Sequence, residues 1–302
     1  MRKNTPILNK SNLASLLALT FLTFGPLSVF NHSYAQSQNS AQNIIITPKE
    51  DMTGDTLTVK IKKEAGTIKG PKVFFDKSKV PVFELPNNYY RALIPISANF
   101  SERPYLLEVF YSRKGEEFKI NVKETKYPIE NLTLSKEVTA LKASRIEKDS
   151  VNEALSVVSE KKLWNDKFIF PSSGRKSTMY GVKRRINGVI SKDYFHKGLD
   201  FASDLGSNVS APAPGKVILA GLVSNGFVVN GNCIFLDHGH GVISAYLHLS
   251  SVLVKEGQMV KKGDIIGKVG SSGIASGPHL HWGLYLLGMT VDPSFWTSMT
   301  IE

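Results

Sequence analysis

The sequence has 302 residues and a single cysteine, Cys233. An intramolecular disulfide is therefore excluded, and an oxidising compartment is compatible with the composition but is not used to cross-link the fold. Because Cys233 lies far from the apolar run near the N-terminus, we also expect no lipid anchor on an N-terminal cysteine. Its apolar neighbours Ile234 and Phe235 predict a buried, structural thiol.

Stretches of basic residues interleaved with aromatic residues are also missing, so nucleic acid is not an expected partner. Charged residues make up 21% of the chain and hydrophobic residues 42%, which is typical of a globular protein. The formal net charge is +11. The first 35 residues hold three basic residues and no acidic one, which leaves 34 basic against 26 acidic residues in the remainder. This surplus favours anionic surroundings, such as a membrane face or a polyanionic polymer.

Beyond the N-terminal region, no segment is long and apolar enough to span a bilayer. At the N-terminus, a positively charged start precedes the mostly apolar residues 13–30, and the small residues Ser33 and Ala35 suit a cleavage site. We therefore predict a secretory signal over residues 1–35, cleaved after Ala35, and an exported protein. The alternative is an uncleaved membrane anchor, against which Pro26 and the shortness of the apolar run argue.

Residues 42–125 predict a small β-sandwich of the immunoglobulin-like kind. Apolar and polar residues alternate along three runs, 57–61, 107–111 and 118–122, as expected for strands with one buried face. The pair Lys114-Gly115 between the last two runs is a turn signal. No cluster of histidine, cysteine or carboxylate residues occurs in this part of the sequence, so we expect a structural or binding module.

Residues 126–165 predict a linker that contains an amphipathic helix, from about residue 140 to residue 160. Four apolar residues follow helical spacing along one face: Val151, Ala154, Leu155 and Val158. We expect this helix to be a connector that packs on a neighbouring domain.

Residues 166–302 predict a mostly antiparallel β domain with frequent glycines and without a helix. Residues 237–241 predict the tight turn of a hairpin, in which we expect His238 to stabilise the turn and His240 to be exposed. Five runs have strand character: 217–220, 233–237, 242–249, 264–269 and 279–286.

Two histidine motifs of this domain have a spacing that restricts what they can bind. His279 and His281 are two residues apart in a predicted strand, so their side chains share one face. They would lie roughly 7 Å apart, which suits one metal ligand and one neighbouring group. His196 and Asp200 would lie roughly 13 Å apart in an extended chain. They can share a metal ion only if the chain bends, which Gly198 would permit.

Imidazoles and a carboxylate, without a cluster of thiolates, are the ligand chemistry of a catalytic zinc site. Such sites use three protein ligands and leave one position for a water molecule, whose pKa falls to about 7. Histidines that do not bind the metal, such as His248 on another predicted strand, can orient that water and relay protons. Each motif alone is a weak signal, because a single histidine more often packs in the core or lies on the surface. Their combination in one domain indicates a metal site.

The stretch from residue 170 to residue 296 resembles the lysostaphin/LytM-type zinc metallopeptidases, which cleave peptide cross-links of bacterial peptidoglycan. The chain departs from the common pattern of that family at Trp282-Gly283, which stands in place of Phe-Glu. Leu247 replaces the commoner alanine, and we expect it to point away from the site. Three motifs of the family appear, H-x-x-x-D, Y-x-H-L-S and G-P-H-L-H, at residues 196–200, 246–250 and 277–281.

This resemblance implies a compact, strongly curved antiparallel sheet with a groove over the metal. It implies three ligands for one zinc ion: His196, Asp200 and His281. It implies two catalytic histidines: His248 and His279. We further expect two aromatic side chains to contact the substrate: Tyr180 and Tyr246.

The function expected from the resemblance is that of an exported zinc metalloendopeptidase of the periplasm or cell envelope, which hydrolyses peptide bonds in peptidoglycan stem peptides or cross-bridges. One alternative is a non-catalytic regulator of cell-wall amidases, which the complete ligand set disfavours. Another is a wall-binding adaptor that acts through its N-terminal β domain. No obligate protein partner is indicated. We also expect the N-terminal domain or the polar insertion at residues 181–194 to cover the groove until substrate arrives.

Overall fold

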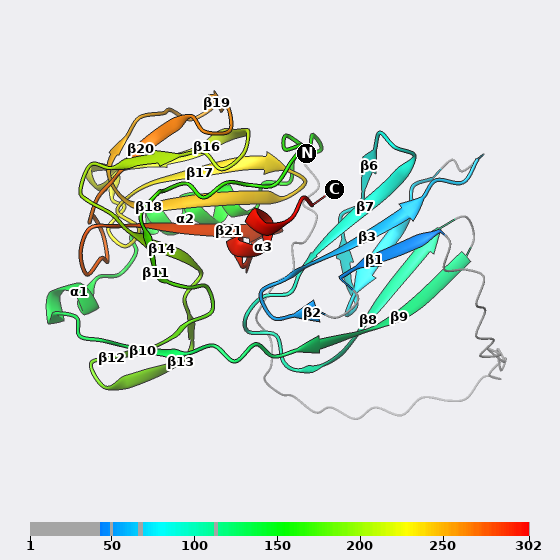
Figure 1. Cartoon of the computed structure of the whole chain (residues 1–302), viewed down its shortest axis with the longest axis horizontal. Coiled ribbons are helices and arrows are strands. Elements are labelled where there is room, and N and C mark those ends of the chain that lie inside the picture. The colour runs from blue at the N-terminus through cyan, green and yellow to red at the C-terminus, as the bar shows by residue number, and fades with distance from the viewer. Residues whose placement is uncertain (1–42, 49–50, 66–68, 112–113, 302) are drawn as a thin grey trace, which may run out of the picture.

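The computed structural model describes residues 43–48, 51–65, 69–111 and 114–301, so the predicted secretory signal lies outside the described residues. Two β-rich bodies lie side by side, and a linker of one strand and two helices runs from the first to the second (Figure 1). The prediction of a mostly β protein is confirmed. No helix in these described ranges is long and apolar enough to cross a membrane.

The N-terminal body consists of two sheets whose inner faces share one core. The predicted alternation is present in β8 (Arg103–Tyr111): the side chains of Leu107 and Val109 are buried, and Leu106 between its buried neighbours is 40% exposed. Immunoglobulin-like connectivity stays a prediction. One sheet contains β1 (Ile44–Thr47), β3 (Thr56–Lys62), β7 (Tyr89–Pro95) and β6 (Phe83–Leu85), in that order. The other contains β2 (Asp51–Met52), β9 (Lys114–Lys123), β8 (Arg103–Tyr111), β4 (Lys72–Phe75) and β5 (Ser78–Val80).

The linker contains β10 (Ile129–Leu132) and two helices, α1 (Lys136–Ala140) and α2 (Arg145–Leu155). The predicted amphipathic helix is therefore shorter than expected, because Ser144 caps α2 and the helix ends before Val158, which is 38% exposed. Its apolar face packs as predicted, with Ala154 buried in a cluster on the C-terminal sheet. The linker is also more than a connector, because β10 pairs in parallel with β12 (Lys183–Ile186) of the C-terminal body.

The C-terminal body is built on a ten-stranded sheet whose strand pairs are all antiparallel. Its main path is β11 (Arg175–Thr178), β14 (Gly198–Ala202), β21 (His279–Leu286), β18 (Val242–Val252), β17 (Asn232–Gly239), β16 (Gly215–Gly221) and β19 (Met259–Val260). Off this path lie β15 (Asn208–Ser210), β20 (Ile265–Val269) and β22 (Met289–Val291). A separate three-stranded sheet combines β10 with β12 (Lys183–Ile186) and β13 (Val189–Phe195).

The prediction of a C-terminal domain without a helix is wrong in detail. The 3-10 turn η2 (Val223–Asn225) and the short helix α3 (Pro293–Ser298) interrupt the β structure. Asp292 caps α3 by accepting a hydrogen bond from the N–H of Ser294, and Pro293 occupies the first turn, where it costs no helical hydrogen bond. Local capping therefore outweighs the surrounding strand pattern.

The predicted hairpin turn is confirmed between β17 and β18, with positive φ values of 52° at His240 and 76° at Gly241. The expectation that His240 is exposed is wrong, because the N-terminal body covers this turn. The His240 ring is 2% exposed and stacks on Phe83 of β6 at a centroid distance of 3.9 Å. Its Nδ1 lies 2.6 Å from Nη2 of the fully buried Arg91. Stacking and hydrogen bonding at this turn therefore join the two bodies.

Candidate active site

Strand β21 lies between β14 and β18 and brings the three histidine motifs together. Asp200 of β14 pairs directly with His281, so their side chains project from the same face of the sheet. On the other side, Leu247 of β18 pairs with His281, and the next residue is His248. The register of β18 against β20 shifts just beyond this point, and His248 has a φ of 63°. Such a bulge re-aims a side chain, so both Leu247 and His248 line the groove. The expectation that Leu247 points away is therefore wrong.

His196 and Asp200 approach each other because the chain turns between β13 and β14, at His196 and Lys197. The predicted bend exists, but Gly198 has another role there. A Cβ at Gly198 would lie 2.3 Å from the carbonyl oxygen of Trp282, so only glycine lets β14 approach β21 this closely. The absence of a side chain at this position places Asp200 beside His281.

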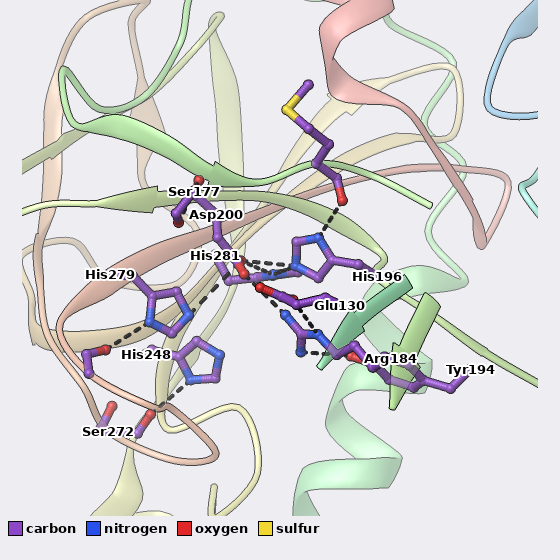
Figure 2. Close-up of polar contacts among 12 residues, drawn as sticks. Glu130, Ser177, Arg184, Tyr194, His196, Asp200, His248, Ser272, His279 and His281 are labelled. Atoms are coloured by element: carbon purple, nitrogen blue, oxygen red, sulfur yellow. Dashed lines mark hydrogen bonds and ion pairs between the residues drawn. The ribbon is translucent and has the colours of Figure 1, made fainter. Parts of the chain in front are cut away.

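Three side chains form a buried cluster, which we call the metal cluster: His196, Asp200 and His281. Oδ1 of Asp200 lies 2.9 Å from Nε2 of His196 and 2.8 Å from Nδ1 of His281. The two ring nitrogens are 3.0 Å apart (Figure 2). All three candidate ligand atoms lie within 4.8 Å of one another.

The chemistry of this donor set fits a cation. Nδ1 of His196 lies 2.9 Å from the carbonyl oxygen of Met179 and must donate there, so Nε2 of a neutral His196 presents its lone pair to Asp200. Two electron-rich atoms facing each other at this distance repel, and a cation held between them removes that repulsion. Imidazole nitrogens and a carboxylate oxygen are ligands that zinc accepts. The residues present therefore fit a zinc ion.

Electrostatics in the metal cluster favour the charge states that ligands need. Burial alone would raise the pKa of Asp200, but its contacts with His196 and His281 outweigh burial and hold that pKa below its usual value. Burial lowers the pKa of His281. Asp200 is therefore ionised and His281 neutral at neutral pH.

His248 and His279 lie together beside the metal cluster, with ring centroids 4.9 Å apart (Figure 2). Nδ1 of His248 donates to the carbonyl oxygen of Ser272 at 2.8 Å, and Nδ1 of His279 donates to that of Gly277 at 2.8 Å. These bonds leave each Nε2 free to accept a proton. Nε2 of His279 lies 3.9 Å from Oδ1 of Asp200. Burial is the larger cause, and repulsion from the neighbouring histidines the smaller, that lowers the pKa of His248 to about 3. Its ring is therefore neutral at pH 7.

The two tyrosines predicted to contact substrate are buried, and neither lines the groove. Tyr180 is 2% exposed, and its hydroxyl donates to the carbonyl oxygen of Thr290 and accepts from the N–H of Ala98. Tyr246 is fully buried, and its hydroxyl lies 2.7 Å from Oγ of Ser244. We therefore correct both assignments to packing and internal hydrogen bonding.

Sequence reasoning missed a second group of polar residues, centred on Arg184 of β12. Nη2 of Arg184 lies 3.3 Å from Oδ2 of Asp200, and Nη1 donates to the hydroxyl of Tyr194 at 3.1 Å (Figure 2). Nε of Arg184 lies 3.5 Å from a carboxylate oxygen of Glu130, on β10 of the linker. The only sequence signal was the polar insertion before His196, which was expected to cover the groove. Instead, most of it forms strands β12 and β13, and Arg184 from β12 contacts Asp200 directly.

A groove of about 1400 Å³ runs over these residues. The N-terminal body contributes Ser97 and Asn99 to its lining, and the linker contributes residues of β10, α1 and α2. The insertion at residues 181–194 contributes Arg184, Ile186 and Tyr194, so both predicted covering elements border the groove. Whether they regulate access stays a prediction.

A mostly antiparallel β domain with a buried His-Asp-His cluster and two adjacent histidines fits the metallopeptidase class that the sequence predicts. Residues 194–293 match the model of Peptidase family M23. Residues 194–293 are therefore similar to peptidase family M23, and the lysostaphin/LytM-type resemblance is confirmed.

Named relatives agree with this similarity. Over 119 residues the chain is 40% identical to an uncharacterized metalloprotease of Haemophilus influenzae. This match covers 39% of the present chain and 24% of the Haemophilus protein. Over 109 residues it is 37% identical to the peptidoglycan DD-endopeptidase ShyA of Vibrio cholerae. This match covers 36% of the present chain and 24% of ShyA. The matched region thus spans about a quarter of the length of these relatives.

A crystal structure of a Pseudomonas aeruginosa protein assigned to the M23 peptidases is similar over most of the chain. The TM-score is 0.59 at 28% sequence identity, and the match covers 82% of this chain and 94% of the other. Because the C-terminal body alone is too short for that coverage, the likeness extends beyond it into the linker and the N-terminal body.

Proposed function

We propose that the protein is an exported, zinc-dependent endopeptidase that hydrolyses peptide bonds in peptidoglycan stem peptides or cross-bridges. The observation that supports this most strongly is the convergence of the metal cluster with two further histidines, His248 and His279, whose Nδ1 atoms donate to backbone carbonyls and whose Nε2 atoms stay free to accept a proton. The printed name of the relative ShyA supports the choice of peptidoglycan as substrate. The periplasm or cell envelope is the proposed location.

In this proposal, Nε2 of His196, Oδ1 of Asp200 and Nδ1 of His281 hold one zinc ion. When bound, zinc polarises the scissile carbonyl and lowers the pKa of a bound water to about 7. Arg184 binds the other carboxylate oxygen of Asp200 and so keeps Oδ1 directed at the two histidines. The zinc ligands are thus held by the protein before any substrate binds.

The role of His248 and His279 follows from their hydrogen bonds. Both rings have their Nδ1–H tied to a backbone carbonyl, which fixes orientation and tautomer. A neutral Nε2 beside the metal cluster can take a proton from the nucleophile and later return it to the leaving amine. A protonated ring also offers an N–H to the negative oxygen that develops in the transition state.

The groove supports an extended polymer as the substrate rather than a small molecule. Its volume of about 1400 Å³ exceeds that of a typical small-ligand pocket, which is at most about 1,000 Å³. Its walls come from both bodies, and the positive charge of the chain suits an anionic polymer. The regulator alternative is disfavoured because all five site residues are present and converge.

The test is digestion of purified peptidoglycan by the protein without residues 1–35, with and without a chelator, followed by mass identification of the fragments. We expect peptide fragments that disappear with the chelator and return when zinc is added. The His279→Ala variant, which keeps every proposed zinc ligand, is the control for contaminating hydrolases. If zinc binds in a one-to-one ratio but no fragment is released, the enzyme proposal fails and the regulator alternative replaces it.

A further inference from the structure

A carboxylate of the linker lies buried against the C-terminal body, away from the metal cluster. Glu147 of α2 is 1% exposed. Its two oxygens accept hydrogen bonds from three consecutive backbone N–H groups, at 3.0 Å from Val228, 3.1 Å and 3.3 Å from Val229, and 2.6 Å from Asn230. A buried carboxylate is stable only when its oxygens are satisfied, and here backbone groups satisfy them.

The sequence around Glu147 would give it a different partner. Ser144 and Glu147 have the spacing of a capping box, in which the glutamate returns to the N–H of the capping serine. Ser144 fulfils its part by accepting from the N–H of Glu147 at 3.0 Å. The carboxylate of Glu147 is directed instead to the segment of residues 228–230. The carboxylate of Glu147 therefore binds α2 to residues 228–230 instead of capping the N-terminus of its own helix.

The segment held by Glu147 in turn holds His248. The carbonyl oxygen of Asn230 accepts a hydrogen bond from the N–H of His248 at 3.0 Å. Two residues on from Asn230, the N–H of Asn232 donates to Oγ of Ser272 at 2.9 Å. The carbonyl oxygen of Ser272 accepts the hydrogen bond from Nδ1 of His248. The backbone and the ring of His248 are thus both attached to loops tied to this segment.

His248 needs such support because its φ of 63° is a conformation that non-glycine residues rarely adopt. Positions of this kind are strained and persist only where their surroundings hold them. The hydrogen bond to the carbonyl oxygen of Asn230 is one of these constraints, and Glu147 holds the same residue through its N–H.

We propose that Glu147 is a positioning residue, which acts through Asn230 to hold His248 in its left-handed conformation with its ring beside His279. This inference rests on the proposed function, because it assigns a purpose to the orientation of His248. It makes the linker helix a working part of the active site. It also separates Glu147 from the metal cluster, since His248 is not a proposed zinc ligand.

The test compares Glu147→Gln with the wild type in the full chain without residues 1–35. Glutamine keeps the shape but turns one acceptor oxygen into a donor that faces N–H groups. A displacement of about 1 Å in a catalytic group can cost about 100-fold in rate, so we expect kcat on peptidoglycan peptides to fall by about 10- to 100-fold. KM should change by less than about threefold, and bound zinc should stay at the wild-type level. Hydrogen exchange of the amides in residues 228–230 should become faster.

Two control variants separate positioning from general stability. Glu153→Gln changes the same residue type on the exposed side of the same helix and should leave every readout unchanged. Ile243 lies in the apolar cluster that packs on α2, so Ile243→Val should lower the urea midpoint of unfolding without affecting kcat. The proposal is overturned if kcat of Glu147→Gln equals that of the wild type. It is also overturned if zinc is lost together with activity, or if exchange in residues 228–230 is unchanged.

Failure of the proposed function would look different. A wild type that releases no fragment would refute the peptidase proposal. In that case the ¹⁵N resonances of the His248 ring, which report its hydrogen bond to Ser272, still test the positioning. They should shift in Glu147→Gln and not in Glu153→Gln, and an unshifted ring would overturn the inference on its own.

Discussion

Replacing Arg184 by glutamine tests whether the residues around the metal cluster strengthen metal binding. The two oxygens of the Asp200 carboxylate have different partners. Oδ1 faces the two histidines, and Oδ2 lies 3.3 Å from the Arg184 guanidinium. The side chains of Arg184 and Asp200 are 19% and 7% exposed, so solvent screens the pair only partly. Without the arginine, Oδ2 loses its charged partner and the carboxylate can rotate.

Loss of a partner that orients a metal ligand typically costs about 10- to 100-fold in metal affinity or activity. That range corresponds to about 1.4–2.7 kcal/mol. We expect the lower half of it, because the contact of 3.3 Å is longer than an ideal charged hydrogen bond. The arginine charge also opposes a nearby cation, so the two effects have opposite signs and the measurement decides between them.

The assay is competition for zinc against a chromophoric chelator, with Arg185→Gln as the matched control. Arg185 is the next residue of β12 and donates to Oδ1 of Asn131 at 3.0 Å, so its replacement removes the same charge without touching Asp200. Arg184→Gln should bind zinc about tenfold more weakly, and Arg185→Gln should match the wild type. If Arg184→Gln binds zinc as tightly as the wild type, or more tightly, the charge repulsion dominates and the orienting role is refuted.

Three further predictions concern the cluster, the pH dependence and the contact between the bodies. His281→Ala should lose zinc, whereas His279→Ala should keep zinc and lose turnover by about 10²–10⁴-fold. Metal analysis measures the bound zinc and peptidoglycan digestion measures the turnover. Equal zinc loss in both variants would contradict the assignment of the ligands. Burial lowers the pKa of His238 to about 4. Because the unfolded state takes up a proton near pH 6.5 and the folded state does not, the free energy of unfolding should fall by about 3 kcal/mol as the pH drops from about 6.5 toward 4. Urea unfolding at pH 7.5 and 4.5 should show this loss in the wild type and a smaller loss in His238→Gln, and parallel losses would refute it. Arg91→Ala should lower the free energy of unfolding by about 2–4 kcal/mol, because it removes a large buried side chain and leaves Nδ1 of the buried His240 without its partner. An unchanged urea midpoint would show that this contact does not stabilise the fold.

Much of the arrangement could be predicted from the sequence because it depends on local patterns. Alternation of apolar and polar residues marks strands, and the two-residue spacing of His279 and His281 places both on one face whatever the rest of the fold. The motif at residues 196–200 needed a bend, and the bend exists. What local patterns could not supply was the pairing of β14 with β21, which places Asp200 opposite His281, 81 positions away in the sequence.

The errors share a physical cause, which is burial by parts of the chain that are distant in sequence. His240 occupies a hairpin turn, where solvent exposure is the reasonable expectation, but the N-terminal body covers it. Tyr180 precedes the polar insertion and was assigned to substrate, yet its hydroxyl bonds to Ala98 and Thr290, far from it in sequence. Arg184 is one of several basic residues in a polar run, and only the fold shows which of them contacts Asp200.

Several of these contacts between distant residues come from the linker. They indicate where the N-terminal boundary of the metallopeptidase domain should be placed. The predicted boundary at residue 166 remains a prediction based on composition. The contacts argue for a boundary near residue 126, because β10 adds a strand to the sheet of β12 and supplies Glu130 to Arg184. Further along, α2 supplies Glu147 to the segment that holds His248. One linker carboxylate thus contacts Arg184 beside the metal cluster and the other holds the segment bonded to His248, the proposed catalytic histidine, so a fragment that starts at residue 166 lacks groups that both parts of the site use.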